Sequence, residues 1–441
     1  MKPIDHIPTS KIKRASQLAK TGVKVGSNYL KYYGEKLVNP ELDKSKLNQA
    51  NAEDIYNSLK HLKGSALKAA QMLSMEKNIM PSEFIEKFSL AQFSVPPLSA
   101  PLVNKTFRTY FHKPPEAVFD RFNPEAVGAA SIGQVHEAWS GDKKLAVKIQ
   151  YPGVAESISS DLAMVKPVAL RLFNLSAADV EHHFKEVEHK LLEETDYTLE
   201  LQQGQDMIAA CEHLPGIHFP RYYPEFSSSR ILTMDWMEGQ HLSEYVKSQP
   251  TQAQRNQVGQ TLWDFYMYQW HGLRKLHADP HPGNFLVNGD HGLIVLDFGC
   301  MKAIPESFYQ PSVELLQTAN LHDPHLLEQQ LARLEIFKPT DQPEDIAYML
   351  KVSQEMVAVL TQPFRAAHFD FGEPTYFQQI NQLSEKYSKD PQLRKLSGGR
   401  GSQHFLYFNR TFFGLYLLLH DLQAQIEVEQ DIPRFLARFT P

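Results

Sequence analysis

The stretch that decides the interpretation of this chain is His277-Ala-Asp-Pro-His-Pro-Gly-Asn284, followed thirteen residues later by Asp297-Phe-Gly299. Between them, apolar runs on either side of Gly289-Asp-His-Gly292 predict two short strands joined by a turn. This hairpin would bring Asn284 and Asp297 together. An amide oxygen and a carboxylate are ligands that Mg²⁺ accepts, usually together with phosphate oxygens of a substrate.

The spacing of Asp279 and Asn284 is that of the catalytic loop of protein kinases, and Asp297 stands where these enzymes carry Asp-Phe-Gly. Transfer of a γ-phosphate needs cations to neutralise spreading charge, groups that hold Mg²⁺, and a lysine that fixes the other phosphates. We therefore assign Asp279 to placing or deprotonating the nucleophile, and Asn284 and Asp297 to Mg²⁺. Either motif alone is a weak signal, whereas both in this order form a strong one.

A lysine for this role lies upstream in Leu145-Ala-Val-Lys-Ile-Gln150, a segment rich in β-forming residues. Lys148 faces away from its apolar neighbours and is assigned to the nucleotide phosphates; the alternative is a surface lysine on an edge strand. A carboxylate on the following helix should pair with it, and Glu194 and Glu200 are both candidates. Asp196 and Glu200 share one helical face, whereas Glu194 points elsewhere. Without this pairing, these carboxylates form an acidic face in solvent.

Alternation over 131–139, a turn at Gly141-Asp142 and the β-rich segment 144–150 predict a second hairpin. Small residues fill the centre of Gly128-Ala-Ala-Ser-Ile-Gly133, at the start of this hairpin. Such a segment lets backbone N–H groups approach phosphate oxygens, although alanines make it stiffer than a glycine-rich loop. The strand predicted over 231–239, after a helical region at about 154–209, is assigned to nucleotide binding as well. The further nucleotide-binding residues that we predict are Ala129, Ala130, Ser131, Met234 and Met237.

The order of these segments predicts an α+β, bilobal protein-kinase-like fold, with a small β-rich N-lobe and a large helical C-lobe. Helix signals ahead of the N-lobe add a helical N-terminal extension. The predicted boundaries are 1–45 for a basic amphipathic segment, 46–115 for the extension, 116–240 for the N-lobe and 241–441 for the C-lobe.

The composition argues against a nucleic-acid-binding protein, a secreted protein and a membrane-spanning protein. The 441 residues carry a formal net charge of −6, so we expect no nucleic-acid partner. Two cysteines make no disulfide framework, and the N-terminus lacks the apolar segment of a secretory signal, so we expect a cytoplasmic protein. The most apolar stretch, 405–419, contains Asn409 and Arg410 and falls short of the ~20 apolar residues of a membrane span. It predicts a buried helix.

The first forty residues are basic, and apolar residues recur in them at helical spacing. A basic amphipathic helix can lie on an anionic membrane surface. The simpler interpretation is a helix that packs its apolar side on the rest of the protein.

Taken together, the motifs resemble those of the UbiB (AarF, ADCK) family of atypical kinases. Lys68-Ala-Ala-Gln71 is similar to the Lys-x-Gly-Gln motif of that family, and Glu194-Thr-Asp196 is similar to its Glu-x-Asp motif. The segment 128–136 resembles its Ala-rich loop, and the similarity extends over nearly the whole chain. One departure is Ala70, which replaces the glycine of the first motif and is expected to modulate the site without abolishing it.

The resemblance implies ATP and Mg²⁺ as cofactors, ATPase activity, and support of isoprenoid quinone synthesis. It implies that a helix bearing Lys68 and Gln71 covers the active site where a protein substrate would lie, so that Lys68 takes part in catalysis. Isoprenoid lipid or quinone intermediates and an anionic membrane surface, contacted peripherally, are the partners that it implies. A homodimer is retained as a candidate assembly.

Two other functions use some of the same residues. A metal-dependent hydrolase would use His277, Asp279 and His281 with other histidines. It leaves Lys148 and Asp297 without a role, and prolines stiffen the histidine segment. A nucleotide-gated scaffold, or pseudokinase, would bind ATP and recruit enzymes at a membrane without catalysis. The sequence argues mildly against it, because the lysine, both aspartates and the asparagine are all present.

Overall fold

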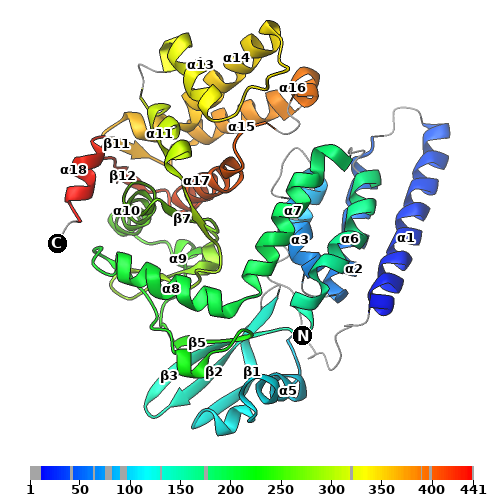
Figure 1. The fold of residues 1–441 in the computed structure, drawn as a ribbon, viewed down its shortest axis with the longest axis vertical. Coiled ribbons are helices and arrows are strands. Elements are labelled where there is room, and N and C mark those ends of the chain that lie inside the picture. Colours follow the sequence, from blue (N-terminus) through cyan, green and yellow to red (C-terminus); the bar gives the residue numbers. More distant parts are fainter. Residues whose placement is uncertain are drawn as a thin grey trace. The chain divides into compact units, whose positions relative to one another are not determined.

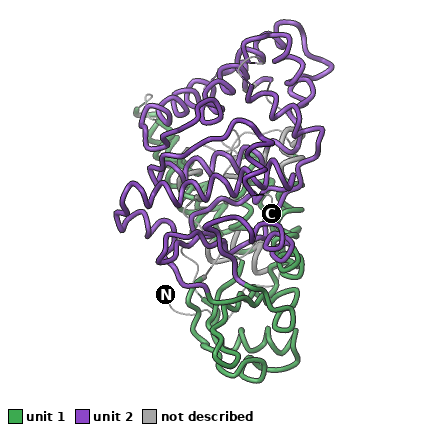
Figure 2. Tube along the Cα trace, turned by 90° about the vertical axis from the view of Figure 1, so that its left-hand side faces the viewer, with its two compact units in different colours: residues 1–202, 221–236 green, residues 203–220, 237–441 purple. Residues whose placement is uncertain are grey.

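The computed structural model describes residues 11–39, 43–62, 65–74, 82–89, 97–129, 132–172, 177–317, 321–388, 390–396 and 400–439. The chain forms two compact units, shown in different colours in Figure 2. Unit 1 comprises Met1–Gln202 and Arg221–Trp236, and unit 2 comprises Gln203–Pro220 and Met237–Pro441.

Unit 1 contains a four-stranded antiparallel sheet in the order β1-β2-β3-β5 (Figure 1). Its strands are β1 (Arg121–Ala129), β2 (Gly133–Ser140), β3 (Lys143–Gln150) and β5 (Ile231–Asp235). The hairpin predicted over 131–150 is confirmed as β2 and β3. Gly141 makes its turn with φ = 58°, which glycine adopts without strain. Along β3, Val147 and Ile149 are buried on one side while Lys148 lies on the other. Strand β1, which contains Pro124 and bulges in its pairing with β2, was not predicted.

Most of the other elements of unit 1 are helices. They are α1 (Lys11–Val38), α2 (Ser45–Leu62), α3 (Ser65–Ser74), α4 (Ser82–Ser89), α5 (Ala100–Phe111), α6 (Val154–Leu172), α7 (Ala177–Glu194) and the first part of α8 (Tyr197–Cys211), with short 3₁₀ turns at Pro115–Ala117 and Pro224–Phe226. Phe107 of α5 is fully buried and stacks edge-on against Phe119 and Phe122, which joins this helix to β1. Helix α2 ends at Leu62 and helix α3 begins at Ser65.

Unit 2 is mostly helical, and its described residues form three small sheets. Its strands are β4 (Ile217–His218), β6 (Gln240–His241), β7 (Lys275–His277), β8 (Phe285–Val287), β9 (Leu293–Val295), β10 (Met301–Ala303), β11 (His368–Asp370) and β12 (Gln425–Glu427). The predicted hairpin after the catalytic loop is confirmed as β8 and β9, where Phe285 lies opposite Val295. Strand β7 pairs with β10, with His277 opposite Met301.

The helices of unit 2 beyond α8 are α9 (Leu242–Lys247), α10 (Gln252–Tyr268), α11 (Glu306–Glu314), α13 (Pro324–Arg333), α14 (Pro343–Leu360), α15 (Pro374–Ser388), α16 (Pro391–Leu396), α17 (His404–Asp421) and α18 (Ile432–Ala437). Short helical turns lie at Gln269–Leu273, Pro282–Asn284 and Gln362–Arg365. The sequence between Gln252 and Leu276 has the pattern of one long helix, but α10 ends at Tyr268. A π-helical turn follows Tyr268, and Arg274 adopts the left-handed conformation (φ = 52°), which ends the helix and starts β7.

Helix α17 confirms the buried helix predicted over 405–419. Tyr407, Leu415 and Leu419 of this helix are almost inaccessible to solvent. None of the helices in the described ranges combines the length and the apolar composition that crossing a bilayer requires.

Candidate active site

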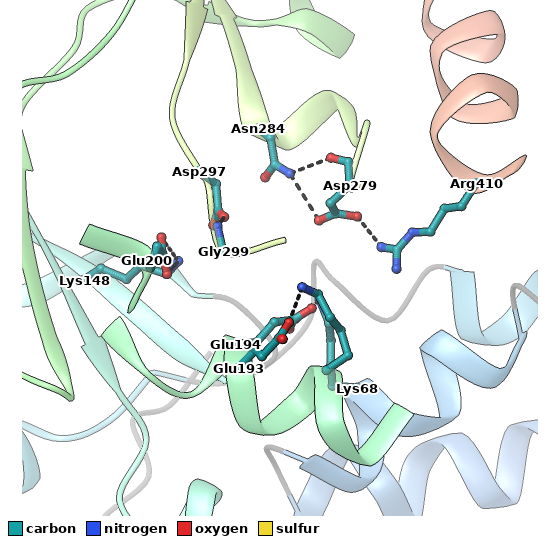
Figure 3. A network of polar contacts seen from close by, with 11 residues as sticks. Lys68, Lys148, Glu193, Glu194, Glu200, Asp279, Asn284, Asp297, Gly299 and Arg410 are labelled. Atoms are coloured by element: carbon teal, nitrogen blue, oxygen red, sulfur yellow. Dashed lines mark hydrogen bonds and ion pairs between the residues drawn. The ribbon is translucent and has the colours of Figure 1, made fainter. Parts of the chain in front are cut away.

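The catalytic-loop residues of unit 2 are held in place by hydrogen bonds. Asn284 Nδ2 donates to the backbone oxygen of Asp279 (2.9 Å) and to its Oδ2 atom (3.2 Å), as Figure 3 shows. The backbone N–H of Leu296 donates to the oxygen of Asn284 (3.0 Å), which fastens the end of the hairpin to the loop. The amide group of Asn284 therefore turns its nitrogen toward Asp279, which leaves its Oδ1 atom as the potential metal ligand.

His277 connects the two halves of the motif. Its Nε2 atom lies 2.8 Å from the backbone oxygen of Asp297, which can only accept, so Nε2 carries a proton. Its Nδ1 atom lies 3.1 Å from the hydroxyl of Tyr266. Burial lowers the pKa of His277, and burial followed by the charge of Asp279 raises the pKa of Tyr266 far above its usual value. The imidazole is therefore neutral and accepts from the Tyr266 hydroxyl.

Asp297 follows β9 and has a fixed carboxylate. The backbone N–H of Gly299 donates to its Oδ1 atom at 2.8 Å (Figure 3). The backbone N–H of Ala278 donates to the backbone oxygen of Cys300 (2.8 Å), which extends the pairing of β7 with β10. The segment that carries Asp279 is thus bound to the segment that carries Asp297 by the side chain of His277 and by the backbone of Ala278.

Arg410 of α17 is a site residue that the sequence analysis missed. Its Nη2 atom forms an ion pair with Oδ1 of Asp279, and both side chains are largely buried (Figure 3). In the sequence, Arg410 stands out only as a charge that interrupts an apolar stretch. A cation in the middle of a buried helix needs a partner, and this is the signal that could have pointed to it.

Gly414 lies one helical turn after Arg410 and contacts the same loop. A Cβ atom placed on Gly414 would overlap with the ring of Pro280. The glycine is therefore required for the close approach of α17 to the catalytic loop.

In unit 1, Lys148 pairs with Glu200. The Nζ atom of Lys148 lies 2.8 Å from Oε1 and 3.0 Å from Oε2 of Glu200, and the glutamate side chain is 3% exposed. Asp196 Oδ1 accepts from the backbone N–H of Thr198 (3.0 Å) and so caps the helix that carries Glu200. Of the two carboxylates that the sequence left open for Lys148, the structure places Glu200 on the lysine.

Glu194 has a different partner. Its Oε2 atom lies 3.2 Å from Nζ of Lys68 on α3, and both side chains are 9% exposed (Figure 3). Glu194 is the last residue of α7, and a break of two residues separates it from α8. Because of this break, two carboxylates six positions apart can serve two different lysines.

Several predicted residues have little or no structural description. Ala130 and Ser131 lie outside the described residues, as do the side chains of Ala129 and Gln71. Met234 is buried in β5, opposite Ala146 of β3, and Met237 is the half-buried first residue of the second segment of unit 2.

The residues of unit 2 fit Mg²⁺ better than a transition metal. Asn284 and Asp297 offer oxygen atoms, and Mg²⁺ commonly takes one or two protein ligands together with substrate phosphates and water. Across the part of the chain that the structure describes, no group of three or more His, Cys, Asp or Glu side chains could hold a metal ion. The metal-dependent hydrolase finds no support in these residues.

Comparison with known families settles the class of the chain. A family model described as an ABC1 atypical kinase-like domain matches residues 90–331, more than half of the sequence. The chain is a member of the ABC1 (UbiB/AarF/ADCK) family of atypical kinases. The predicted family and the predicted α+β kinase-like fold are both confirmed.

Individual ABC1 relatives show how far the similarity extends. Atypical kinase COQ8, a mitochondrial protein of Saccharomyces cerevisiae, is 26% identical over 95% of this chain and 83% of its own length. Atypical kinase COQ8B of Danio rerio is 28% identical over 78% of this chain, and an uncharacterised chloroplastic aarF domain-containing protein kinase of Arabidopsis thaliana is 30% identical over 63%. The chain spans only 55% and 40% of the lengths of these last two relatives.

A solved structure supports the fold of this ABC1 protein. The complex of Rv3197 with erythromycin from Mycobacterium tuberculosis matches 90% of this chain and 97% of that protein. The TM-score is 0.62 and the sequence identity is 25%.

Proposed function

We propose that this ABC1 protein binds Mg-ATP and transfers or hydrolyses its γ-phosphate. The observation that supports this most is the nearly buried pair of Lys148 and Glu200. A structural ion pair in such a position is a poor source of stability, because desolvation cancels much of the attraction between the charges. A lysine whose ammonium is held in place by a carboxylate is, however, what positioning a nucleotide requires.

Each group has a role in the proposal. Lys148 would bind the α- and β-phosphates, and Glu200 would orient it. Asn284 Oδ1 and the Asp297 carboxylate would hold Mg²⁺, which neutralises charge on the phosphates. Asp279, fixed between Asn284 and Arg410, would orient the attacking group.

The nucleotide contacts predicted from the sequence belong to the same proposal. These are the small-residue segment Ala129, Ala130 and Ser131, together with Met234 and Met237. Lys68, engaged with Glu194 in unit 1, and Gln71 would cover the site and exclude a protein substrate. Lys68 would take part in catalysis as a second cation near the phosphates.

For the acceptor, we propose water, a lipid or a small metabolite, in the service of isoprenoid quinone synthesis. This part rests on the similarity to the COQ8 proteins. A scaffold that binds nucleotide without turnover is the alternative.

The test is Mg²⁺-dependent ATP binding and phosphate release by the purified chain, compared with Asp297→Asn. Turnover that requires Mg²⁺ and is lost in the variant supports the phosphotransfer proposal. ATP binding without turnover, with function retained by Asp297→Asn in complementation, supports the scaffold. If wild-type protein binds no ATP, both are wrong.

A further inference from the structure

The carboxylate of Asp279 is engaged at both of its oxygen atoms. Oδ1 forms an ion pair with Arg410, and Oδ2 accepts from Asn284 Nδ2 at 3.2 Å (Figure 3). The side chain of Asp279 is 18% exposed and that of Arg410 is 10% exposed, so solvent screens this pair weakly. Both donors favour the ionised carboxylate and oppose its protonation. Asp279 is therefore poorly suited to take a proton from an attacking hydroxyl group.

The histidines of the catalytic loop do not replace Asp279 as a base. His277 carries a proton on Nε2, and its Nδ1 atom accepts from the hydroxyl of Tyr266. His281 uses its Nδ1 atom to accept from the backbone N–H of Gly283 at 3.0 Å, so the proton of the neutral ring lies on Nε2. In this loop the proton-accepting atoms of the carboxylate and of both imidazoles are thus engaged by donors. The loop therefore favours an attacking group that has already lost its proton.

Two cations lie beside the same loop. Arg410 reaches it from α17, and Tyr407, three residues earlier on that helix, belongs to a buried cluster with Ala278 and Cys300. The Nζ atom of Lys302, in β10, lies 4.4 Å from the centre of the Tyr407 ring. Residues three apart share one face of a helix, so both cations lie at the face of α17 that meets the catalytic loop. Positive charge at this place is complementary to an anion.

We propose that the phosphate acceptor is an oxyanion, a carboxylate or a phosphate group, which is already ionised at neutral pH. This inference rests on the proposed phosphotransfer function and narrows its acceptor. The guanidinium of Arg410 has five N–H donors in a planar fork, so it can hold Asp279 and bind an oxygen atom of the acceptor at the same time. Lys302 would add attraction for the anion from the side of Tyr407.

The reaction then needs no proton transfer. An oxygen atom of the acceptor donates an electron pair to the γ-phosphorus, and the bond from that phosphorus to the β,γ-bridging oxygen breaks. The electrons of the broken bond stay with ADP. A carboxylate becomes an acyl phosphate, and a phosphate group becomes a diphosphate. An alcohol or water would have to lose a proton, and the absence of a general base typically lowers a rate by about 10²–10⁴-fold.

Because the natural acceptor is not identified, the reverse reaction is the direct test. The full chain is incubated with Mg-ADP and either acetyl phosphate or pyrophosphate, and the ATP formed is measured with luciferase. We expect ATP from at least one donor, and the active donor distinguishes a carboxylate acceptor from a phosphate acceptor. Asp297→Asn, purified in the same way, should form none, which attributes the ATP to this site. In the forward direction, Mg-ATP with glycerol should give no glycerol phosphate.

Two variants test the cations, after circular dichroism has shown that both are folded. Arg410→Gln should raise the KM for the active donor at least about tenfold and leave the KM for Mg-ADP unchanged, since a charged hydrogen-bond donor is lost. Lys302→Gln should raise the KM for the donor about threefold, the effect of a partly exposed charge. The controls Arg434→Gln and Lys247→Gln replace exposed cations of unit 2 and should match wild type.

The choice of acceptor gives a second readout for Arg410. Arg410→Gln should raise the ratio of transfer to glycerol over transfer involving the oxyanion, because Asp279 without its cation is a better proton acceptor. Arg410→Lys keeps the charge and should not change this ratio. A merely structural role for Arg410 would lower both transfers alike.

The proposal is overturned if the wild-type chain phosphorylates glycerol, or if it releases phosphate from Mg-ATP but forms no ATP from either donor. An unchanged KM for the donor in both Arg410→Gln and Lys302→Gln also overturns it. In each of these cases phosphate transfer is still observed, so the proposed function stands. A chain that binds Mg-ATP without any transfer, or binds none, contradicts the proposed function itself, and the inference falls with it.

Discussion

Gly414 of α17 lies directly against Pro280 of the catalytic loop, so close that even a methyl group on the glycine would overlap with the proline ring. One turn earlier on the same helix, Arg410 forms an ion pair with Asp279. One face of α17 therefore holds two consecutive residues of the loop, one by close packing and one by charge. Together they fix the position of the Asp279 carboxylate.

Gly414→Ala should lower kcat by about tenfold to a hundredfold, because a small displacement of a catalytic group has effects of this size. Alanine is a better helix former than glycine, so the helix itself is not weakened. Steady-state kinetics of ATP turnover check this. Gly289→Ala is the control, since a Cβ there meets no atom within 4 Å. Full activity of Gly414→Ala would show that the loop can shift without consequence.

Arg410→Gln should reduce turnover more than it reduces ATP affinity. The arginine contacts Asp279, whereas the residue proposed to bind the phosphates is Lys148. Arg410→Lys should recover only part of the loss, since an ammonium lacks the planar fork of a guanidinium. Separate measurements of kcat and KM test this. The control Arg434→Gln removes an arginine that is 78% exposed and should match wild type. A change in KM alone would contradict the positioning role.

Lys148→Arg and Glu200→Gln should both weaken ATP binding, because each disturbs the ammonium that the carboxylate holds. Glu194→Gln should have a smaller effect on ATP affinity, since its partner is Lys68. Calorimetric titration with Mg-ATP distinguishes the three variants, after circular dichroism has shown that each is folded. Equal losses in Glu194→Gln and Glu200→Gln would argue against separate roles.

Gly133→Ala should destabilise the protein by about 1–3 kcal/mol, a typical cost of overpacking. A Cβ there would lie 2.7 Å from the hydroxyl of Tyr197 and 2.9 Å from the backbone oxygen of Ile149. Gly128→Ala, at the other end of the small-residue segment, meets no atom within 4 Å and is the matched control. Urea unfolding of both variants measures the difference. Equal stabilities would mean that β2 moves to make room.

Asp341→Asn should destabilise the protein at neutral pH, and the deficit should shrink as the pH falls. Arg400 donates to both carboxylate oxygens of Asp341 (2.5 Å each), and these bonds lower the pKa of Asp341 from 3.8 to about 2. A depressed pKa means that the stabilisation is fully present above pH 3.8 and is lost as the pH falls through about 2. Unfolding of both proteins over this range tests the prediction. A deficit that stays constant down to pH 2 would contradict it.

The sequence predicted the parts of the fold that local patterns determine. The two hairpins followed from alternation and turn residues, and the pairing of Lys148 with a helix carboxylate followed from the similarity of its strand to the lysine strand of kinases. The end of α10 did not follow, because Arg274 in a left-handed conformation has no signature in composition. Strand β1 was missed because its residues lack the apolar alternation of a half-buried strand.

Long-range partners were beyond local patterns. Arg410 reaches Asp279 across 131 positions, and no periodicity states which loop a helical residue will meet. The choice between Glu194 and Glu200 depended on a break at Thr195-Asp196 that helix propensity did not reveal. For α1, the periodicity showed an apolar side but not the direction in which it faces: Val23 and Leu30 are exposed, and Asn28 forms hydrogen bonds to α2. A helix that packs this apolar side on the rest of the protein is therefore wrong for these residues.

The junction between α7 and α8 constrains length more than identity. Glu194 at its start is bound to Lys68, and Glu200 just beyond it is bound to Lys148. One residue inserted in the first turn of α8, between Tyr197 and Glu200, would rotate Glu200 about the helix axis by about 100°, so that both pairs could not form together. Homologous chains that keep both lysines should therefore tolerate substitutions between these two glutamates far better than insertions or deletions.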